Sequence, residues 1–244
     1  MIKGICKYCG QEKELIKSHI IPKCMYRLKE TGPLIGINDL NYTIDTNPIH
    51  QNGIKEPLMC KECDNIIGKL DNYVFGIFNQ ILEKYQIEKE QNILSTFPVS
   101  DKFDYWKFKK FFISVVWRLS VSSSRFTLGP YEDIALKMLK DEIHDNPDLF
   151  LSLVYHMDTQ SKMDKISICY GNKTNGKRIY GFHIPYFSFM VIPNTEHSNN
   201  PEKMNMLKSL FRPNNIMIQR VNEIPIYEKQ FEEILIKCYK NKKK

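Results

Sequence analysis

Two Cys-x-x-Cys pairs constrain the fold of this chain more than any other feature of its sequence. Cys6 and Cys9 form the first pair, and Cys60 and Cys63 form the second, about 50 residues further on. Four thiolates suit a closed tetrahedral zinc site, and zinc bound by both pairs would fix the segment between them. We therefore expect a structural Zn²⁺ bound by these four cysteines, with the run 17–23 (KSHIIPK) inside the loop that the metal closes.

The other cysteines carry no comparable pattern. The chain has seven cysteines and no visible export leader, so its thiols should stay reduced and a disulfide framework is not expected. Cys24, Cys169 and Cys238 have no close cysteine partner in the sequence, and we interpret them as small buried hydrophobic residues. A thiol redox protein is an alternative interpretation of the Cys-x-x-Cys pairs, and it predicts no bound metal and a titratable disulfide.

Length and hydrophobicity are those of a globular protein. A chain of 244 residues that is 42% hydrophobic can bury a substantial core, either in one large domain or in two small ones. No apolar run reaches the roughly 18 residues that a membrane-spanning helix needs. We expect a cytoplasmic protein that does not interact with membranes.

The charge is unevenly placed along the chain. Residues 1–30 hold seven Lys or Arg against three Glu, and residues 237–244 hold five Lys, so the two ends contribute +4 and +5 to a net charge of +7. Clustered cations favour a polyanionic partner because they release counterions from a phosphate backbone. A general preference for lysine, which outnumbers arginine 29 to 6, is the alternative explanation. The lysine-rich tail is expected to be disordered.

Hydrophobic patterning places two strands and a helix around the cysteine pairs. Residues 15–22 and 53–59 read as extended segments, and the apolar residues in 73–85 recur at the spacing of one helix face. Residues 25–52 have no clear period and read as a long insertion. The order predicts a zinc-stapled ββα unit, similar to a treble clef, in an N-terminal domain over residues 1–95.

The second half of the chain predicts an α+β domain over residues 96–244. Helices are expected at 103–119 and 131–143, and the aromatic stripe of the first is interpreted as core. Asn175-Gly176 indicates a hairpin. Residues 194–203 read as a loop and residues 227–239 as a final amphipathic helix. Strands that should form a predominantly antiparallel sheet are expected at 149–156, 165–170, 178–184, 186–192 and 215–221.

The N-terminal motifs resemble those of the HNH, or ββα-metal, nuclease family, in its zinc-bearing branch with four cysteines. Three runs carry the resemblance: Cys6-Lys7-Tyr8-Cys9-Gly10, Ser18-His19-Ile20-Ile21-Pro22 and Leu58-Met59-Cys60-Lys61-Glu62-Cys63-Asp64. They cover roughly residues 4–75. Treble-clef modules that cut nothing use similar cysteines, so the motifs alone do not settle the activity.

The resemblance implies a metal-dependent endonuclease that cleaves nucleic acid, with DNA as the expected substrate. It implies that His19 is the general base and that Asp64 binds a catalytic Mg²⁺ or Mn²⁺, with help from Ser18 or Asp71. Family members leave 5′-phosphate and 3′-hydroxyl ends, and a role in restriction or phage defence is plausible by analogy. Lys17, Lys23 and Asn52 are expected to contact the substrate.

The chemistry of phosphodiester hydrolysis is consistent with these residue types. Imidazole has a pKa near neutral pH and can remove a proton from the attacking water. A divalent ion stabilises charge on the phosphate oxygens and on the leaving alkoxide. A carboxylate with several waters suits Mg²⁺ or Mn²⁺, so the catalytic ion and the zinc are separate.

Three positions depart from the family pattern. Ser18 stands where many members have an acid or histidine, Lys55 stands where many have asparagine, and Asp64 stands where histidine or asparagine is commoner. Asp64 also has a simpler interpretation as a helix cap. These departures favour the alternative function, a catalytically inactive zinc-scaffolded module that binds nucleic acid or protein. A homodimer or a partner protein is compatible with either function.

Overall fold

The structure is a computed structural model, and it describes eleven segments of the chain. Side chains are described in residues 2–25, 55–83, 103–123 and 127–143 and at Ile184 and Phe187. The described segments are residues 2–27, 35–37, 55–87, 94–98, 103–123, 127–143, 149–156, 166–174, 177–184, 187–193 and 215–221.

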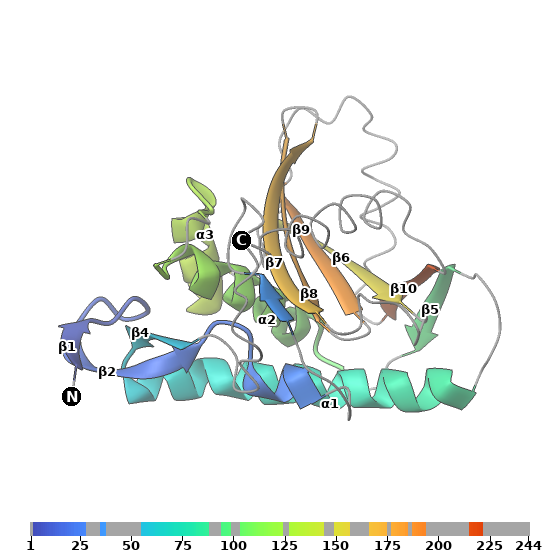
Figure 1. The fold of residues 1–244 in the computed structure, drawn as a ribbon, viewed down its shortest axis with the longest axis horizontal. Helices are drawn as coiled ribbons and strands as arrows, with labels where there is room; N and C mark the ends of the chain where they lie inside the picture. The colour runs from blue at the N-terminus through green and yellow to red at the C-terminus, as the bar shows by residue number, and fades with distance from the viewer. Residues whose placement is uncertain are drawn as a thin grey trace, which may run out of the picture.

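A small antiparallel sheet forms the N-terminal end of the molecule. Its strands are β1 (Ile2–Ile5), β2 (Glu12–His19) and β4 (Lys55–Met59), in the order β1-β2-β4. The sheet lies above the first half of helix α1 (Figure 1). Strand, strand and helix therefore follow one another as the sequence predicted, although β2 begins and ends three residues earlier than the expected extended segment.

Helix α1 (Lys61–Ile87) begins directly after Cys60, the first cysteine of the second pair. It extends beyond both ends of the periodic segment 73–85 seen in the sequence. One side of it is buried, and the buried residues recur at helical spacing from Cys63 to Leu82. The buried apolar side chains are Cys63, Ile67, Val74, Ile77, Phe78, Ile81 and Leu82. The same helix therefore carries a cysteine pair at its start and a core face along its length.

Helix α2 (Tyr105–Ser120) packs against α1 and forms the centre of the core. Asp104 caps its N-terminus, because the Asp104 carboxylate accepts a hydrogen bond from the Lys107 N–H at 3.0 Å. Eleven of its residues are buried, including four aromatic rings. Phe78 of α1 meets Phe108 and Phe111 edge to face, with ring centroids 6.2 and 6.3 Å apart. The aromatic stripe is core, as predicted.

Helix α3 (Tyr131–Leu139) packs against α2 and ends four residues before its predicted end. The Tyr8 hydroxyl, from the first cysteine loop, donates a hydrogen bond to the Leu139 carbonyl at 3.0 Å. The Tyr8 ring also meets Trp117 edge to face at 6.1 Å. Tyr8 therefore joins the first cysteine loop to the helices of the second half of the chain.

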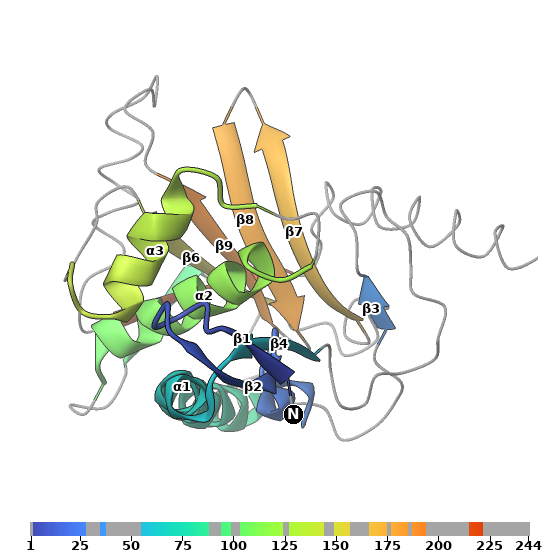
Figure 2. The same cartoon turned by 90° about the vertical axis from the view of Figure 1, so that its left-hand side faces the viewer.

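A seven-stranded sheet lies beside α2, and its Phe187 also stacks on Phe78 of α1 with ring centroids 4.4 Å apart (Figures 1 and 2). Four of its six strand pairings are antiparallel, as predicted, and the pairings β3–β7 and β6–β10 are parallel. Thr174 pairs with Lys177, which confirms the expected hairpin. Its order is β3-β7-β8-β9-β6-β10-β5, with bounds Ile35–Ile37, Ile166–Thr174, Lys177–Ile184, Phe187–Pro193, Leu149–His156, Asn215–Val221 and Leu94–Pro98.

Two strands from the first 98 residues belong to this large sheet. β3 lies in the expected insertion and pairs with β7, and β5 pairs with β10. The buried residues also form one cluster that extends from Cys6 to Phe187. Strands from both halves of the chain therefore pair in this sheet, and the domain boundary expected near residue 95 stays a prediction. The predictions for residues 194–203, 227–239 and the tail at 237–244 lie outside the described residues.

None of the helices in the described segments combines the length and the hydrophobicity that crossing a lipid bilayer requires.

Candidate metal centre

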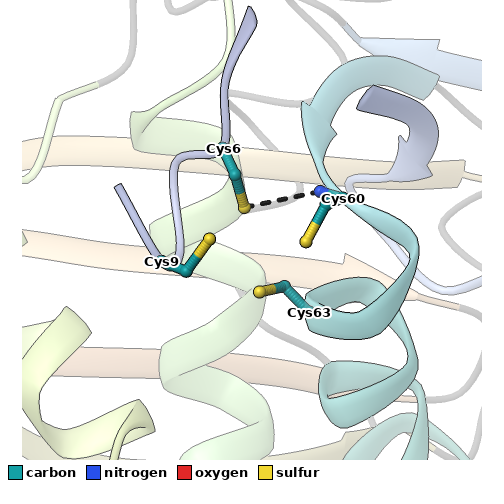
Figure 3. Close-up of side chains that lie close together, drawn as sticks. All are labelled: Cys6, Cys9, Cys60 and Cys63. Carbon is teal, nitrogen blue, oxygen red and sulfur yellow. Dashed lines mark hydrogen bonds between the residues drawn. The ribbon is translucent and has the colours of Figure 1, made fainter. Parts of the chain in front are cut away.

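The first cysteine pair lies in the tight turn that joins β1 to β2. The Gly10 N–H donates to the Cys6 carbonyl at 2.8 Å, and the Cys6 N–H donates to the Gln11 carbonyl at 2.9 Å. Gly10 has a φ of 74°, a backbone conformation that glycine adopts without the steric cost of a side chain. This turn directs the two sulfurs to the same side of the loop (Figure 3).

The second cysteine pair lies where β4 passes into α1. Cys60 precedes the helix, and Cys63 lies in its first turn. The Lys7 N–H donates to the Leu58 carbonyl at 2.9 Å, so main-chain hydrogen bonding joins the first cysteine loop to β4. The two cysteine pairs are therefore brought together by the fold around them.

The four cysteine sulfurs converge on one point, as Figure 3 shows. All lie within 4.8 Å of one another, and the Cys60 N–H points at the Cys6 sulfur across 3.4 Å. Cys6, Cys60 and Cys63 are buried, and Cys9 is half-buried. Four converging thiol groups can hold a metal such as zinc, whereas a redox Cys-x-x-Cys motif needs only one pair.

The electrostatics of the cluster also favour a bound cation. Burial and the neighbouring cysteines raise the pKa of Cys63, and burial raises the pKa of Cys60. Burial would raise the pKa of Cys6 as well, but main-chain N–H groups lower it to about 7. A cation could hold all four sulfurs as thiolates in so small a space, because it offsets their mutual repulsion. Within the described residues, no second group of three or more metal-ligating side chains gathers in this way.

His19 is the last residue of β2 and lies on a defined face of it. It pairs with Lys55 of β4, and strand alternation puts it on the same face as Lys13. The Lys13 ammonium lies 3.6 Å from a carboxylate oxygen of Glu62, which is in the first turn of α1. The Lys13 side chain therefore links the N-terminal part of this face to the first turn of α1. His19 is half-buried, and its Nε2 atom is shielded from solvent.

Asp64 lies in the first turn of α1, on the side of the helix that also carries Asp71. It is the fourth helical residue, and its N–H donates to the Cys60 carbonyl at 3.0 Å, so it lies past the position of a helix cap. A carboxylate in the first turn still interacts favourably with the helix dipole. Asp64 is half-buried, and its role as an ion ligand stays a prediction.

Asp71, two turns further along α1, is bound by a buried arginine. Arg118 Nη1 donates to one Asp71 oxygen at 3.1 Å, and Nη2 donates to the other at 3.0 Å. Burial raises the pKa of Asp71, and the guanidinium opposes that shift. Both oxygens would have to leave Arg118 before Asp71 could bind an ion.

Arg118 also holds the end of the strand that carries His19. Its Nη1 donates to the His19 carbonyl at 3.0 Å, and Ser114 accepts its two remaining hydrogen bonds at 3.2 Å. All five N–H groups of the guanidinium are therefore used. Arg118 was not among the residues that the sequence motifs indicated. A single arginine within the apolar run FFISVVWRLS is the signal that could have indicated a buried acidic partner.

The remaining predicted site residues do not all lie on the same face as His19. Ser18 is almost fully buried and adjoins His19 on β2, so its side chain lies on the opposite face of the strand. Within the described residues its hydroxyl has no hydrogen-bond partner. Lys17 is exposed on β2, and Lys23 is exposed in the short 3₁₀ helix Lys23–Arg27. Asn52 lies outside the described residues.

Comparison with known proteins identifies no relative of this chain. No protein-family model matches the chain, and neither a curated protein nor a solved structure matches it significantly.

Proposed function

We propose that this protein is a metal-dependent endonuclease that hydrolyses phosphodiester bonds of nucleic acid, with DNA as its substrate. One observation carries the proposal. Convergence of the four cysteine sulfurs joins the β1–β2 turn to the start of α1, and the face of β2 that bears His19 also bears Lys13, whose ammonium pairs with Glu62 in the first turn of that helix. Asp64 lies in the first turn of the same helix.

The residues divide the chemistry among them. The four cysteines hold the structural zinc, which is separate from the reaction. His19 accepts the proton of the attacking water, and Asp64 offers an oxygen to a Mg²⁺ or Mn²⁺ ion. When bound, that ion supplies charge stabilisation for the phosphate and the leaving oxygen. The exposed Lys17 and Lys23 attract phosphate groups toward His19.

A second candidate function is a zinc-scaffolded module that binds nucleic acid or protein without cutting it. Three observations favour it: Arg118 binds both Asp71 oxygens, Ser18 faces away from His19, and Nε2 of His19 is shielded from solvent. A site of this kind has fewer groups ready for an ion than the family pattern supplies. The zinc-bound scaffold would then bind a partner through its surface without catalysing a reaction.

Plasmid nicking separates the two functions. Supercoiled DNA is incubated with Mg²⁺ or Mn²⁺ and with wild-type protein, His19→Ala or Asp64→Ala, each matched for zinc content by metal analysis. A general base contributes roughly 10²- to 10⁴-fold, so His19→Ala should slow nicking by at least about 100-fold. Asp64→Ala should raise the Mn²⁺ concentration needed for half-maximal rate or abolish nicking.

Asp133→Ala is the matched control, because Asp133 is an exposed aspartate of α3 with only a surface ion pair to Lys137. It should nick DNA at the wild-type rate. Equal rates for wild type and His19→Ala would contradict the nuclease, as would the absence of cleavage on both DNA and RNA. Absence of cleavage with retained binding would instead support the second function.

A further inference from the structure

One face of the small sheet carries two lysines beside His19. His19 pairs directly with Lys55, and residues directly opposite in an antiparallel pair have their side chains on the same face. Lys17 precedes His19 by two positions and shares that face as well. The register skips Leu58 on β4, so the bulge leaves the alternation of β2 intact. Lys17, His19 and Lys55 therefore form one surface, the β2–β4 face.

The two lysines of the β2–β4 face are available for a ligand. Both are exposed, and within the described residues neither forms an ion pair. The nearest acid in the strand, Glu56, pairs with Ser18 and so lies on the opposite face. There its carboxylate accepts hydrogen bonds from the Ser123 N–H at 2.7 Å and the Ser123 hydroxyl at 2.8 Å.

The spacing of the two lysines suits an extended polyanion. Lys17 and Lys55 are diagonal neighbours across β2 and β4, a relation that separates Cα atoms by about 7–8 Å. Each lysine is a compact charge on a flexible stem, which matches a phosphate but gives no base-specific contact. A row of such charges predicts binding that depends on salt and depends little on sequence.

The geometry points to the β2–β4 face as the surface that holds the phosphate backbone of duplex DNA, with Lys55 as a phosphate-contacting residue next to His19. Lys55 stands where many members of the HNH family have asparagine, and here it takes a role in binding phosphate. The inference rests on the proposed function for its substrate class. It is tested by binding alone, so its failure is distinct from failure of catalysis.

The test measures the salt dependence of DNA binding. Full-length His19→Ala protein is titrated into a fluorescein-labelled 20-base-pair duplex from about 50 to 200 mM NaCl, and the slope of log K against log [NaCl] is determined. Lys55→Gln is compared with Lys17→Gln, the double variant and the rescue variant Lys55→Arg. The control is Lys69→Gln, because Lys69 is exposed on α1 almost opposite the buried Ile67.

Each lost phosphate contact should reduce the slope by about 0.9, so the double variant should lose about twice that amount. Lys55→Arg and Lys69→Gln should keep the parental slope. A slope for Lys55→Gln equal to that of Lys69→Gln would overturn the inference, as would absence of duplex binding by the parent. Tighter binding of single-stranded RNA than of the duplex would overturn the choice of DNA. If the slopes change as expected but the wild-type protein does not nick DNA, the result supports the DNA-binding surface and contradicts the endonuclease activity.

Discussion

The two ends of the buried cluster are stabilised by different means. At the small sheet, the buried groups around β1, β2 and β4 include three cysteines, a serine, an aspartate and an arginine. Around α2 they are mostly apolar and include four aromatic rings of the helix itself, and Phe78 alone contacts Phe108, Phe111, Phe112 and Phe187. Three short strands offer little apolar area, so cross-linking by one guanidinium, and by a metal if the four cysteines hold one, would add to the packing there.

Under the proposed function, this contrast would let the small sheet present polar residues to a substrate. A packed core needs mainly apolar side chains on its inward positions, whereas a sheet held by a metal could carry Lys17, His19 and Lys55 on one face. The contrast also makes the small sheet dependent on few interactions. Removing one of them should have a large effect, and the following variants examine this in order of expected size.

Loss of the metal should have the largest effect. Structural zinc binds with a free energy on the order of 10 kcal/mol at pH 7, and much of it is folding free energy. Cys63→Ser, or a strong chelator, should therefore unfold the small sheet before the rest of the molecule. Hydrogen exchange should show early loss of protection in residues 2–19 and 55–59, with α2 still protected.

Cys24→Ser is the matched control, because Cys24 lies outside the four-sulfur cluster and burial raises its pKa to about 11. This variant should keep its zinc. Simultaneous loss of protection in the small sheet and in α2 after chelation would show that the two ends unfold as one unit, and the comparison between them would fail.

Breaking the Arg118–Asp71 pair should come next. Arg118→Met leaves the buried Asp71 carboxylate without its cation, and removal of one partner of a buried ion pair costs about 3–5 kcal/mol. Urea unfolding of the zinc-loaded protein should show this loss. The double variant Arg118→Met/Asp71→Leu should recover most of it, because no uncompensated charge remains. A double variant as unstable as Arg118→Met would show that the hydrogen bond to the His19 carbonyl is the main contribution.

The N-terminal cap of α2 should have the smallest effect. Asp104→Ala should cost about 1 kcal/mol, since it leaves the Lys107 N–H without its acceptor. Burial acts to raise the pKa of Asp104, but the N–H and ammonium of Lys107 outweigh it and hold the pKa below its usual value. A lowered pKa means that the stabilisation is present above about pH 4 and fades as the pH falls further.

Asp104→Asn keeps a cap without a titrating carboxyl, so its stability should not show this fading between about pH 4 and 2. Thermal unfolding at several pH values measures it. An identical pH dependence in wild type and Asp104→Asn would assign the acid sensitivity to other carboxyl groups.

Local features of the fold were predictable because local chemistry determines them. The bounds of β6 and β10 are those predicted, since alternation and turn residues mark both ends of each strand. The convergence of the four cysteines followed from their spacing. By contrast, the parallel pairing of β3 with β7 brings residues 35–37 beside residues 166–168, and no local pattern records such a pairing.

The candidate site was less predictable than the fold because it depends on one long-range contact. Asp71 shares a helix side with Asp64, and from the sequence it was a reasonable ion ligand. Its partner Arg118 lies 47 positions away, and only the packing of α2 against α1 brings the two together. The sequence likewise could not show which residues lie beside Ser18, on the face of β2 opposite His19. The pairing of β2 with β4 places Ser18 against Glu56.

Arg118 binds Asp71 and the His19 carbonyl in the first half of the chain, and these contacts affect folding during synthesis. Synthesis delivers the N-terminal end first, and the cysteine ligands are complete once residue 63 has left the ribosome. Asp71 then has neither α2 nor the Arg118 guanidinium beside it until the ribosome has added some 50 further residues. We expect nascent chains that end before α2 to hold metal yet remain loose around Asp71, and to tighten only when residue 118 emerges.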